Sequence, residues 1–201
     1  ASDKLPPKLL RTVEIARRRS GATFRKVRMS EFTRELERVR QIYNRAWERN
    51  YSFVPMDDAE IDYMAASLKS ILGPDLVFLA EVGGQPVGVS ITLPDYNQVL
   101  KSINGRLLPF GWLKVLLGRS KIDTARVFAM GIVPEYRKRG IDAVFYYETF
   151  REGVRKGYQR AELSWPVAGD DGEAELRLVR AAVMLAWLQD CTTSTIPACS
   201  R

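Results

Sequence analysis

Histidine is absent from this sequence, and cysteine occurs only twice, at Cys191 and Cys199. The lack of histidine excludes Ser-His and Cys-His catalysis and removes the most common zinc ligand. Two cysteines near one end form neither a disulfide framework nor a metal-ligand cluster. We therefore expect no metal, and a general base has to be a carboxylate, a tyrosine, a lysine or a water held by one of them.

Long apolar runs are also lacking. The longest covers residues 107–113 and is interrupted by Pro109 and Gly111, whereas a helix that spans a bilayer needs ~20 apolar residues. The first seven residues lack the charged-then-apolar order of a secretory signal. We therefore expect a soluble cytoplasmic protein without a transmembrane segment.

The formal net charge of +7 favours an anionic partner. Nucleic acid, an acidic membrane surface and a phosphate-rich cofactor are the candidates, and charge alone does not choose among them. The basic residues are dispersed and no nucleic-acid motif accompanies them, so we expect no nucleic-acid partner. The apolar stretch 107–117 with its flanking lysines leaves weak contact with a membrane surface open.

The periodicity of apolar residues predicts an α/β fold. The expected elements are helices over 8–19, 31–49, 57–72 and 140–156, and strands over 23–29, 75–82, 86–93, 125–133 and 158–165. A Gly-Gly turn between the second and third strands predicts an antiparallel hairpin. The strand 125–133 is nearly continuously apolar, which predicts a central strand buried on both faces. We expect a mostly antiparallel sheet with a late parallel βαβ crossover and helices on both faces.

Two helices carry start signals. Ser30 is placed to cap the helix 31–49, and Asp57 with Glu60 resembles a capping box at the start of the next helix. Helical spacing predicts the buried face of the helix 31–49, made of Phe32, Leu36, Val39, Tyr43, Ala46 and Trp47.

The chain divides into an N-terminal helical extension, 1–22, and a single domain, 23–201. Within that domain, residues 94–121 form an insertion and residues 166–201 an atypical C-terminal segment.

The most informative stretch runs from the strand 125–133 through a basic loop, Arg137-Lys138-Arg139-Gly140, into a helix. The first amides of a helix have no partner inside it, and the helix dipole adds positive charge there, so a phosphate can bind. Gly140 lets backbone and anion approach closely. The alternative is a basic loop that merely caps a helix, and the spacing alone favours neither interpretation.

The strand, the residues Val133 to Tyr136, and then Arg137-x-x-Gly140 before a helix resemble the acyl-CoA motif of the GNAT N-acetyltransferase superfamily. The family pattern is Arg/Gln-x-x-Gly-x-Gly/Ala, and Asp142 stands here at its last position. The element order also resembles that family over residues 23–165. In the segment 166–201 the sequence departs from it, because that segment contains no tyrosine to serve as the general acid.

The resemblance implies acetyl-CoA or another acyl-CoA as co-substrate and direct attack of an amine on its thioester. It implies that backbone groups of Met130 and Ile132 hold the pantetheine arm. The residues implied around the pyrophosphate are Arg137, Lys138, Arg139, Gly140, Ile141, Asp142 and Ala143.

For catalysis, Glu162 on the last strand is the candidate base. The alternative is a surface glutamate paired with Arg160 or Arg126. The acceptor is expected beside aromatic residues on three segments, which are Tyr51, Phe53, Phe110, Trp112 and Trp165. Packing in a core or lid is the alternative for these aromatics.

The leading hypothesis is an acyltransferase that moves an acetyl or longer acyl group from a CoA-type thioester to a small-molecule or amino-acid amine. One alternative is an acyl-CoA-binding module with impaired catalysis. Another is an N-acyltransferase with a long-chain donor, or with a donor carried by an acyl carrier protein.

Overall fold

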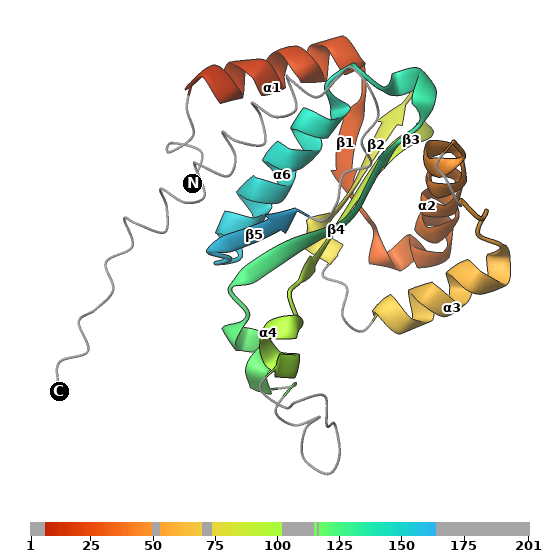
Figure 1. Ribbon diagram of the computed structural model, residues 1–201. Helices are drawn as coiled ribbons and strands as arrows, with labels where there is room; N and C mark the ends of the chain where they lie inside the picture. The colour runs from red at the N-terminus through yellow and green to blue at the C-terminus, as the bar shows by residue number, and fades with distance from the viewer. Residues whose placement is uncertain (1–6, 50–52, 70–73, 102–114, 116, 164–201) are drawn as a thin grey trace.

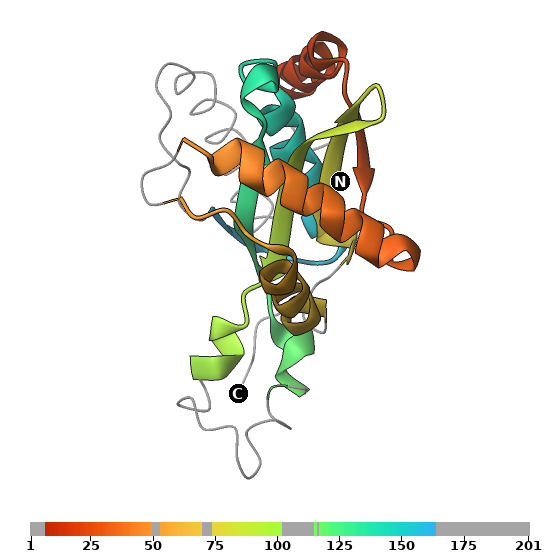
Figure 2. The same ribbon diagram turned by 90° about the vertical axis from the view of Figure 1, so that its right-hand side faces the viewer.

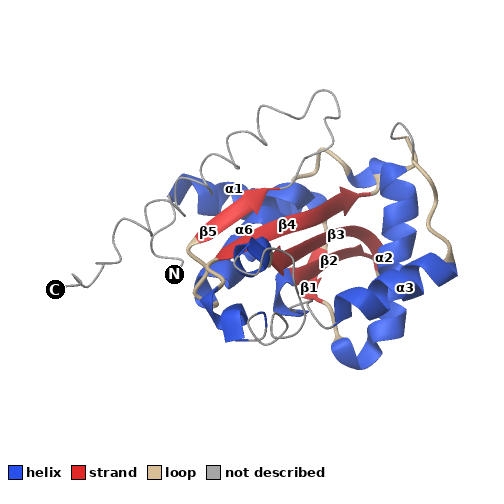
Figure 3. Ribbon diagram, turned by 60° about the horizontal axis from the view of Figure 1, so that its bottom comes forward, coloured by secondary structure: helices blue, strands red, loops and turns tan. Residues whose placement is uncertain are grey.

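The computed structural model describes residues 7–49, 53–69, 74–101, 115 and 117–163. Within these residues the sheet has five strands in the spatial order in which they follow along the chain. They are β1 (Thr23–Lys26), β2 (Val77–Val82), β3 (Gln85–Pro94), β4 (Thr124–Ile132) and β5 (Arg160–Leu163). The first three pairs are antiparallel and the β4–β5 pair is parallel, as Figure 3 shows. The predicted fold class is therefore confirmed.

Helices cover both faces of this sheet. They are α1 (Pro7–Ser20), α2 (Phe32–Trp47), α3 (Asp58–Lys69) and α6 (Ile141–Arg155), while the short α4 (Asn97–Leu100) lies beyond the end of the strands. Helices α1 and α6 lie on one face, and α2 and α3 on the other (Figure 1); Figure 2 shows α2 lying across the strands. Within the described part of the chain, no helix has the length and apolar composition that crossing a membrane requires.

The core is divided by the sheet into two layers. On the α6 face, Phe145 and Phe150 are at most 1% exposed, and Phe145 meets Phe24 of β1 edge to face. On the α2 face, Ile42 packs with Leu79 and Val89, and all three are at most 1% exposed. Each large apolar side chain buried in this way stabilises the fold by roughly 1.5–3 kcal/mol.

Helix α2 departs from its predicted buried face. Ala46 is buried as expected, but the pattern missed Ile42 and Glu35, which are 0% and 2% exposed. Glu35 is buried because two cations neutralise it there: its oxygens lie 2.9 Å from Arg25 and 2.6 Å from Arg38. An amphipathic pattern counts a glutamate as solvent-facing and does not detect such a pair.

The start signals of the two helices have different outcomes. Ser30 does not cap α2: it lies inside a 3-10 turn, Met29–Glu31, and no side chain caps the helix start. That prediction was wrong, because the chain enters α2 through a tighter turn. The capping box is confirmed. The Glu60 amide donates to Asp57 Oδ1 at 2.8 Å, and the Asp57 amide donates to Glu60 Oε2 at 3.2 Å.

The hairpin prediction is also confirmed. Strands β2 and β3 pair around Gly83 and Gly84, whose φ angles of +57° and +79° suit a tight turn with two left-handed residues.

Strand β4 is central, as expected, but it is not buried along its whole length. Thr92 pairs with Val127 and Ile91 with Ala129, so Phe128 is an extra residue without a partner in β3. This bulge leaves Phe128 50% exposed. The expectation of burial on both faces was wrong at this residue.

Candidate functional site

The loop between β4 and α6 presents helix amides at the end of the sheet. The Val133 amide donates to Val87 O at 2.9 Å, which fixes the end of β4. A 3-10 turn, Pro134–Tyr136, then reverses the chain. The backbone hydrogen bond nearest the start of α6 runs from the Val144 amide to Gly140 O at 3.2 Å. The three amides before Val144 have no acceptor inside the helix, which is the arrangement that binds an anion.

Gly140 is required at this loop for two reasons. Its φ of +84° lies in the left-handed region that L side chains rarely adopt. A Cβ at this position would also lie 2.7 Å from the Cβ of Ala16 in α1. Helix α1 therefore packs directly against the start of α6. No local pattern in the sequence predicts this contact.

The three basic side chains of the loop are exposed, and Arg137 and Arg139 contact groups close to the loop. The Arg137 guanidinium donates to Ala46 O at 2.5 Å and to Ile132 O at 3.2 Å. The Arg139 guanidinium lies over the Tyr136 ring, 4.7 Å from its centroid. Lys138 has a φ of +61°, so the loop contains a second left-handed residue. The cations thus shape the loop as well as add positive charge to it.

Backbone groups of β4 alternate between its two edges. Because Val133 and hence Gly131 bond toward β3, Met130 and Ile132 direct their amides and carbonyls to the opposite edge, where β5 lies. The Ile132 carbonyl accepts from Arg137. This orientation is the one that the predicted pantetheine contact needs.

Glu162 lies away from that part of β4. It stands opposite Arg126 in the β4–β5 pair, and its oxygen is 3.3 Å from the Arg126 guanidinium. Met130 is four residues further along β4, roughly 13 Å at the usual rise of a strand. Arg160, the other predicted partner, pairs instead with Asp123 at 2.7 Å.

Of the predicted acceptor residues, Tyr51, Phe110, Trp112 and Trp165 lie outside the described residues. Phe53 is half-buried, and its ring contacts the Tyr43 ring in a tilted arrangement with centroids 5.6 Å apart. Tyr43 in turn lies 5.0 Å from the Trp47 ring. Phe53 is thus packed on the end of α2.

Sequence reasoning missed that this helix end belongs to the site. A Cβ at Gly131 would lie 2.3 Å from the Trp47 ring, so β4 and α2 touch where β4 carries no side chain. Asn44 adds two bonds to the backbone of Met56, at 3.0 and 3.2 Å. The glycine inside an otherwise apolar strand was the available signal for such a close approach.

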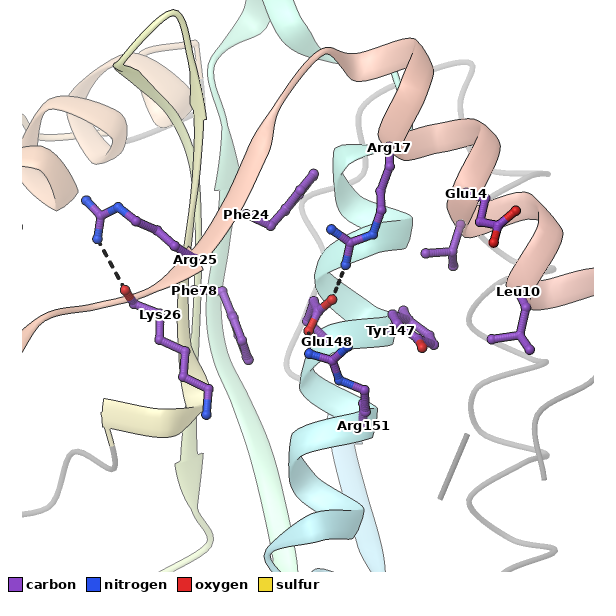
Figure 4. A pocket seen from close by; sticks show the side chains of 11 residues that line it. Leu10, Glu14, Arg17, Phe24, Arg25, Lys26, Phe78, Tyr147, Glu148 and Arg151 are labelled. Carbon is purple, nitrogen blue, oxygen red and sulfur yellow. Dashed lines mark hydrogen bonds and ion pairs between the residues drawn. The ribbon is translucent and has the colours of Figure 1, made fainter. Parts of the chain in front are cut away.

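A hollow of about 660 Å³ lies between α1, β1 and the middle of α6 (Figure 4). Apolar side chains form part of its lining, and charged groups complete it. Its cations have acidic partners: Arg17 and Arg151 bind Glu148, and Lys26 lies 3.0 Å from Glu152. Glu148 and Glu152 are 5% and 4% exposed. These pairs link α1 and β1 to α6.

The same ion-pair network predicts a stability change in acid. The hydrogen bond from Lys156 lowers the pKa of Asp75, burial opposes this, and Lys26 lowers it again, with a net shift below the ordinary value. A carboxyl with a lowered folded pKa stabilises the fold above its unfolded pKa of about 3.9, and this contribution is lost as the pH falls through the folded pKa.

We therefore expect Asp75→Asn to be less stable than the wild type at pH 7 and to unfold at a lower temperature. Its free energy of unfolding should fall by less than about 1 kcal/mol, since the ion pair is partly exposed. The two proteins should converge in stability as the pH falls below about 4. Thermal unfolding across this range checks the expectation. The control is Asp58→Asn, which removes an exposed carboxylate in the first turn of α3, where it pairs with Arg40 of α2. A difference in stability between Asp75→Asn and the wild type that stays constant with pH would contradict the expectation.

Comparisons with known proteins agree with this architecture. No protein-family model matches the chain. It is 35% identical over 164 residues to a protein named bacterial ceramide synthase from Caulobacter vibrioides, covering 76% of this chain and 43% of that protein. It is 32% identical over 160 residues to protein YghO of Escherichia coli, covering 77% and 41%. The chain thus spans about two fifths of the length of these curated relatives.

Solved structures show the fold. An N-acetyltransferase from Staphylococcus aureus superposes with a TM-score of 0.51 at 16% identity, covering 80% of this chain and 81% of that one. A polyamine N-acetyltransferase from Drosophila melanogaster gives a TM-score of 0.50 at 13% identity, covering 80% and 81%. The mixed sheet and these superpositions confirm the resemblance at the level of the fold: the chain has the fold of the GNAT-type N-acetyltransferases.

Proposed function

We propose that this domain transfers an acyl group from a CoA thioester to an amine. The observation that carries the proposal is the start of α6, where Gly140 has a φ of +84° and three amides precede the helix bond from Val144 to Gly140. These amides lie at the positive end of the helix dipole, where a diphosphate binds. The GNAT fold and the exposed basic loop support the same function.

In the proposed reaction, the amine nitrogen bonds to the thioester carbonyl carbon and the carbon–sulfur bond breaks. The amine loses a proton and the CoA thiolate gains one, so the products are an amide and free CoA. Amides of β4 that face away from β3, at Met130 and Ile132, are suited to hold the donor and to polarise its carbonyl oxygen.

Glu162 stays the predicted base, but its ion pair with Arg126 favours the alternative that it is a structural strand residue. Strand β4 itself carries no carboxylate. A water held at the site, or a group outside the described residues, would then accept the amine proton.

We further propose that the substrates are long-chain: a fatty acyl donor and a long-chain amino alcohol as acceptor. The relative that is 35% identical is named a ceramide synthase, and ceramide is the amide of such a pair. Exposed apolar side chains support this proposal. Phe128 on β4 is 50% exposed, and Leu100 and Leu117, which lie within the insertion 94–121, are 39% and 65% exposed.

The test has two steps. Calorimetric titration with CoA measures donor binding, and release of free thiol from acetyl-CoA and palmitoyl-CoA measures transfer. The acceptors are a polyamine and sphinganine, each with both donors. Turnover only with the pair palmitoyl-CoA and sphinganine supports the long-chain proposal. Turnover only with the pair acetyl-CoA and polyamine supports acyl transfer but contradicts the long-chain substrates.

The same experiment separates the enzyme from a binding module. CoA binding without turnover on any acceptor favours the module with impaired catalysis. A carrier-protein donor is tested by repeating the assay with palmitoyl acyl carrier protein. Absence of CoA binding by the folded protein contradicts the proposed function.

Asp142 gives a further prediction, because it occupies the position where the family pattern has glycine or alanine. It lies partly buried in the first turn of α6. Two like charges within about 4 Å repel by about 1 kcal/mol in water, so Asp142→Asn should tighten CoA binding about fivefold. It should also destabilise the protein by about 0.3–1 kcal/mol, since an acid near a helix start is favourable.

Titration calorimetry and thermal unfolding check the two effects separately. Glu60→Gln, which neutralises an acid in the first turn of α3, is the control and should leave CoA affinity unchanged. Weaker CoA binding by Asp142→Asn would show that the carboxylate supports the donor instead of repelling it.

A further inference from the structure

We infer that Arg137 is a positioning residue: it fastens the motif loop to the end of α2 and thereby links the donor loop to the segment predicted to line the acceptor site. This inference rests on the proposed function for its catalytic meaning. Its structural content, however, stands on the contacts of the guanidinium alone.

The guanidinium of Arg137 spans two elements that are distant in the sequence. One nitrogen donates to Ala46 O at 2.5 Å, across 91 residues. Another donates to Ile132 O at 3.2 Å, at the end of β4. Both acceptors are backbone carbonyls, so the positive charge is directed into the fold at the place where β4, the loop and α2 meet.

These contacts have a clear physical reason. Helix α2 ends at Trp47, and the last four carbonyls of a helix have no N–H donor within the helix. The Ala46 carbonyl is one of these, and it carries the negative end of the helix dipole. An arginine satisfies such a carbonyl and interacts favourably with the dipole. Hydrogen bonds that involve a charged group are about twice as strong as neutral ones.

Further contacts also hold the motif loop and β4 against the end of α2. The Trp47 ring fills the space above Gly131, where a Cβ would lie 2.3 Å away. Glu135 of the loop binds Arg45 at 2.8 Å, although both side chains are more than half exposed and the pair contributes little. Arg137 is therefore the strongest polar link between the loop and α2 among the described residues.

The end of α2 also holds the segment after it. Asn44 forms two hydrogen bonds with the backbone of Met56, and the Tyr43 ring packs against the Phe53 ring. A loose helix end would loosen Phe53 and Met56 with it. Arg137 thus connects the loop predicted to bind the diphosphate with the segment predicted to contact the amine.

Hydrogen exchange of the free protein tests this role without any ligand. In Arg137→Ala, protection of the amides in the last turn of α2 and of the Met56 amide should fall about tenfold, the loss expected for one hydrogen bond to a charged group. Arg137→Lys keeps the charge and one donor and should restore part of the protection. Arg139→Ala is the matched control: it removes the same charge from the same loop, but its partner is the Tyr136 ring, so the end of α2 should not change.

Titration with CoA and with pantetheine, which lacks the phosphates, separates positioning from direct contact. A positioning role predicts faster exchange at α2 together with weaker CoA binding in Arg137→Ala. Unchanged exchange with a loss of CoA affinity that pantetheine does not share would assign Arg137 to the phosphates and overturn the inference. If the wild type binds no CoA, the proposed function fails, while the exchange result still decides whether Arg137 fastens the loop to α2.

Discussion

Replacing Gly140 with aspartate is expected to weaken CoA binding more than about 100-fold, equivalent to about 2.7 kcal/mol, and to destabilise the domain as well. The φ of +84° is a left-handed conformation that costs an L-residue roughly 1–2 kcal/mol. The new Cβ would lie 2.7 Å from the Cβ of Ala16, so α1 has to shift. The carboxylate would also repel a diphosphate from the first amides of α6.

Two further variants separate charge from strain. Gly140→Ala has the same backbone strain and the same contact with Ala16, so the difference in CoA affinity between the aspartate and alanine variants reports the charge. Adding Ala16→Gly to the Gly140→Ala variant removes the methyl that the new Cβ contacts. The relief of this contact should stabilise the double variant by more than the ~1 kcal/mol that a glycine costs in a helix. Calorimetry and chemical unfolding measure both quantities. If Gly140→Asp binds CoA as tightly as the wild type, the diphosphate does not lie at this helix start.

Glu35→Ala is expected to destabilise the domain by about 1.5–3 kcal/mol, because it removes a buried carboxylate that accepts hydrogen bonds from two arginines. Glu35 is 2% exposed, and its two oxygens bind Arg25 of β1 and Arg38 of α2. Arg25 also binds Glu81 of β2 at 2.6 Å. The pKa of Arg25 is raised because, although burial lowers it, the hydrogen bonds that Arg25 donates to Glu81 and Glu35 together outweigh that effect. Glu35 therefore joins α2 to the β1 edge of the sheet.

The matched control is Glu37→Ala, two residues further along the same helix. Glu37 also pairs with an arginine at i+3, Arg40 at 2.9 Å, but its side chain is 44% exposed. An exposed pair of this kind contributes about 0.2–1 kcal/mol. Urea unfolding of both variants measures the difference. Equal destabilisation by the two substitutions would mean that the buried pair contributes no more than the surface pair.

Much of the fold was predictable because its signals are local. The Gly-Gly turn fixed the β2–β3 hairpin, since both glycines adopt positive φ. The Asp57–Glu60 box fixed the start of α3 through bonds across three residues. The Ser30 prediction failed because a 3-10 turn competes for the same residues, and side-chain preference alone does not decide between the two turns.

The candidate site was predictable in part for the same reason. Gly140 at the helix start follows from the order of strand, loop and helix. The family resemblance implied Met130 and Ile132, and the pairing of β4 with β3 decided which way their backbone groups face. The attachment of the loop to the end of α2 did not follow from the sequence, because Ala46 has no distinctive side chain and the pattern of Trp47 predicts only an ordinary core aromatic. The role of Glu162 also depended on its neighbour across the sheet, Arg126.

What the sequence determined by itself is most of the helices and strands and the glycine at the start of α6, because their hydrogen bonds close within a few residues. Only the tertiary structure decided where the charges of Arg137 and Glu35 are directed. The partner of Arg137 lies 91 residues away, and Glu35 is buried because β1 brings Arg25 to it. Charge and burial at these residues depend on which segments the fold brings together, and that information is absent from any local stretch of the chain.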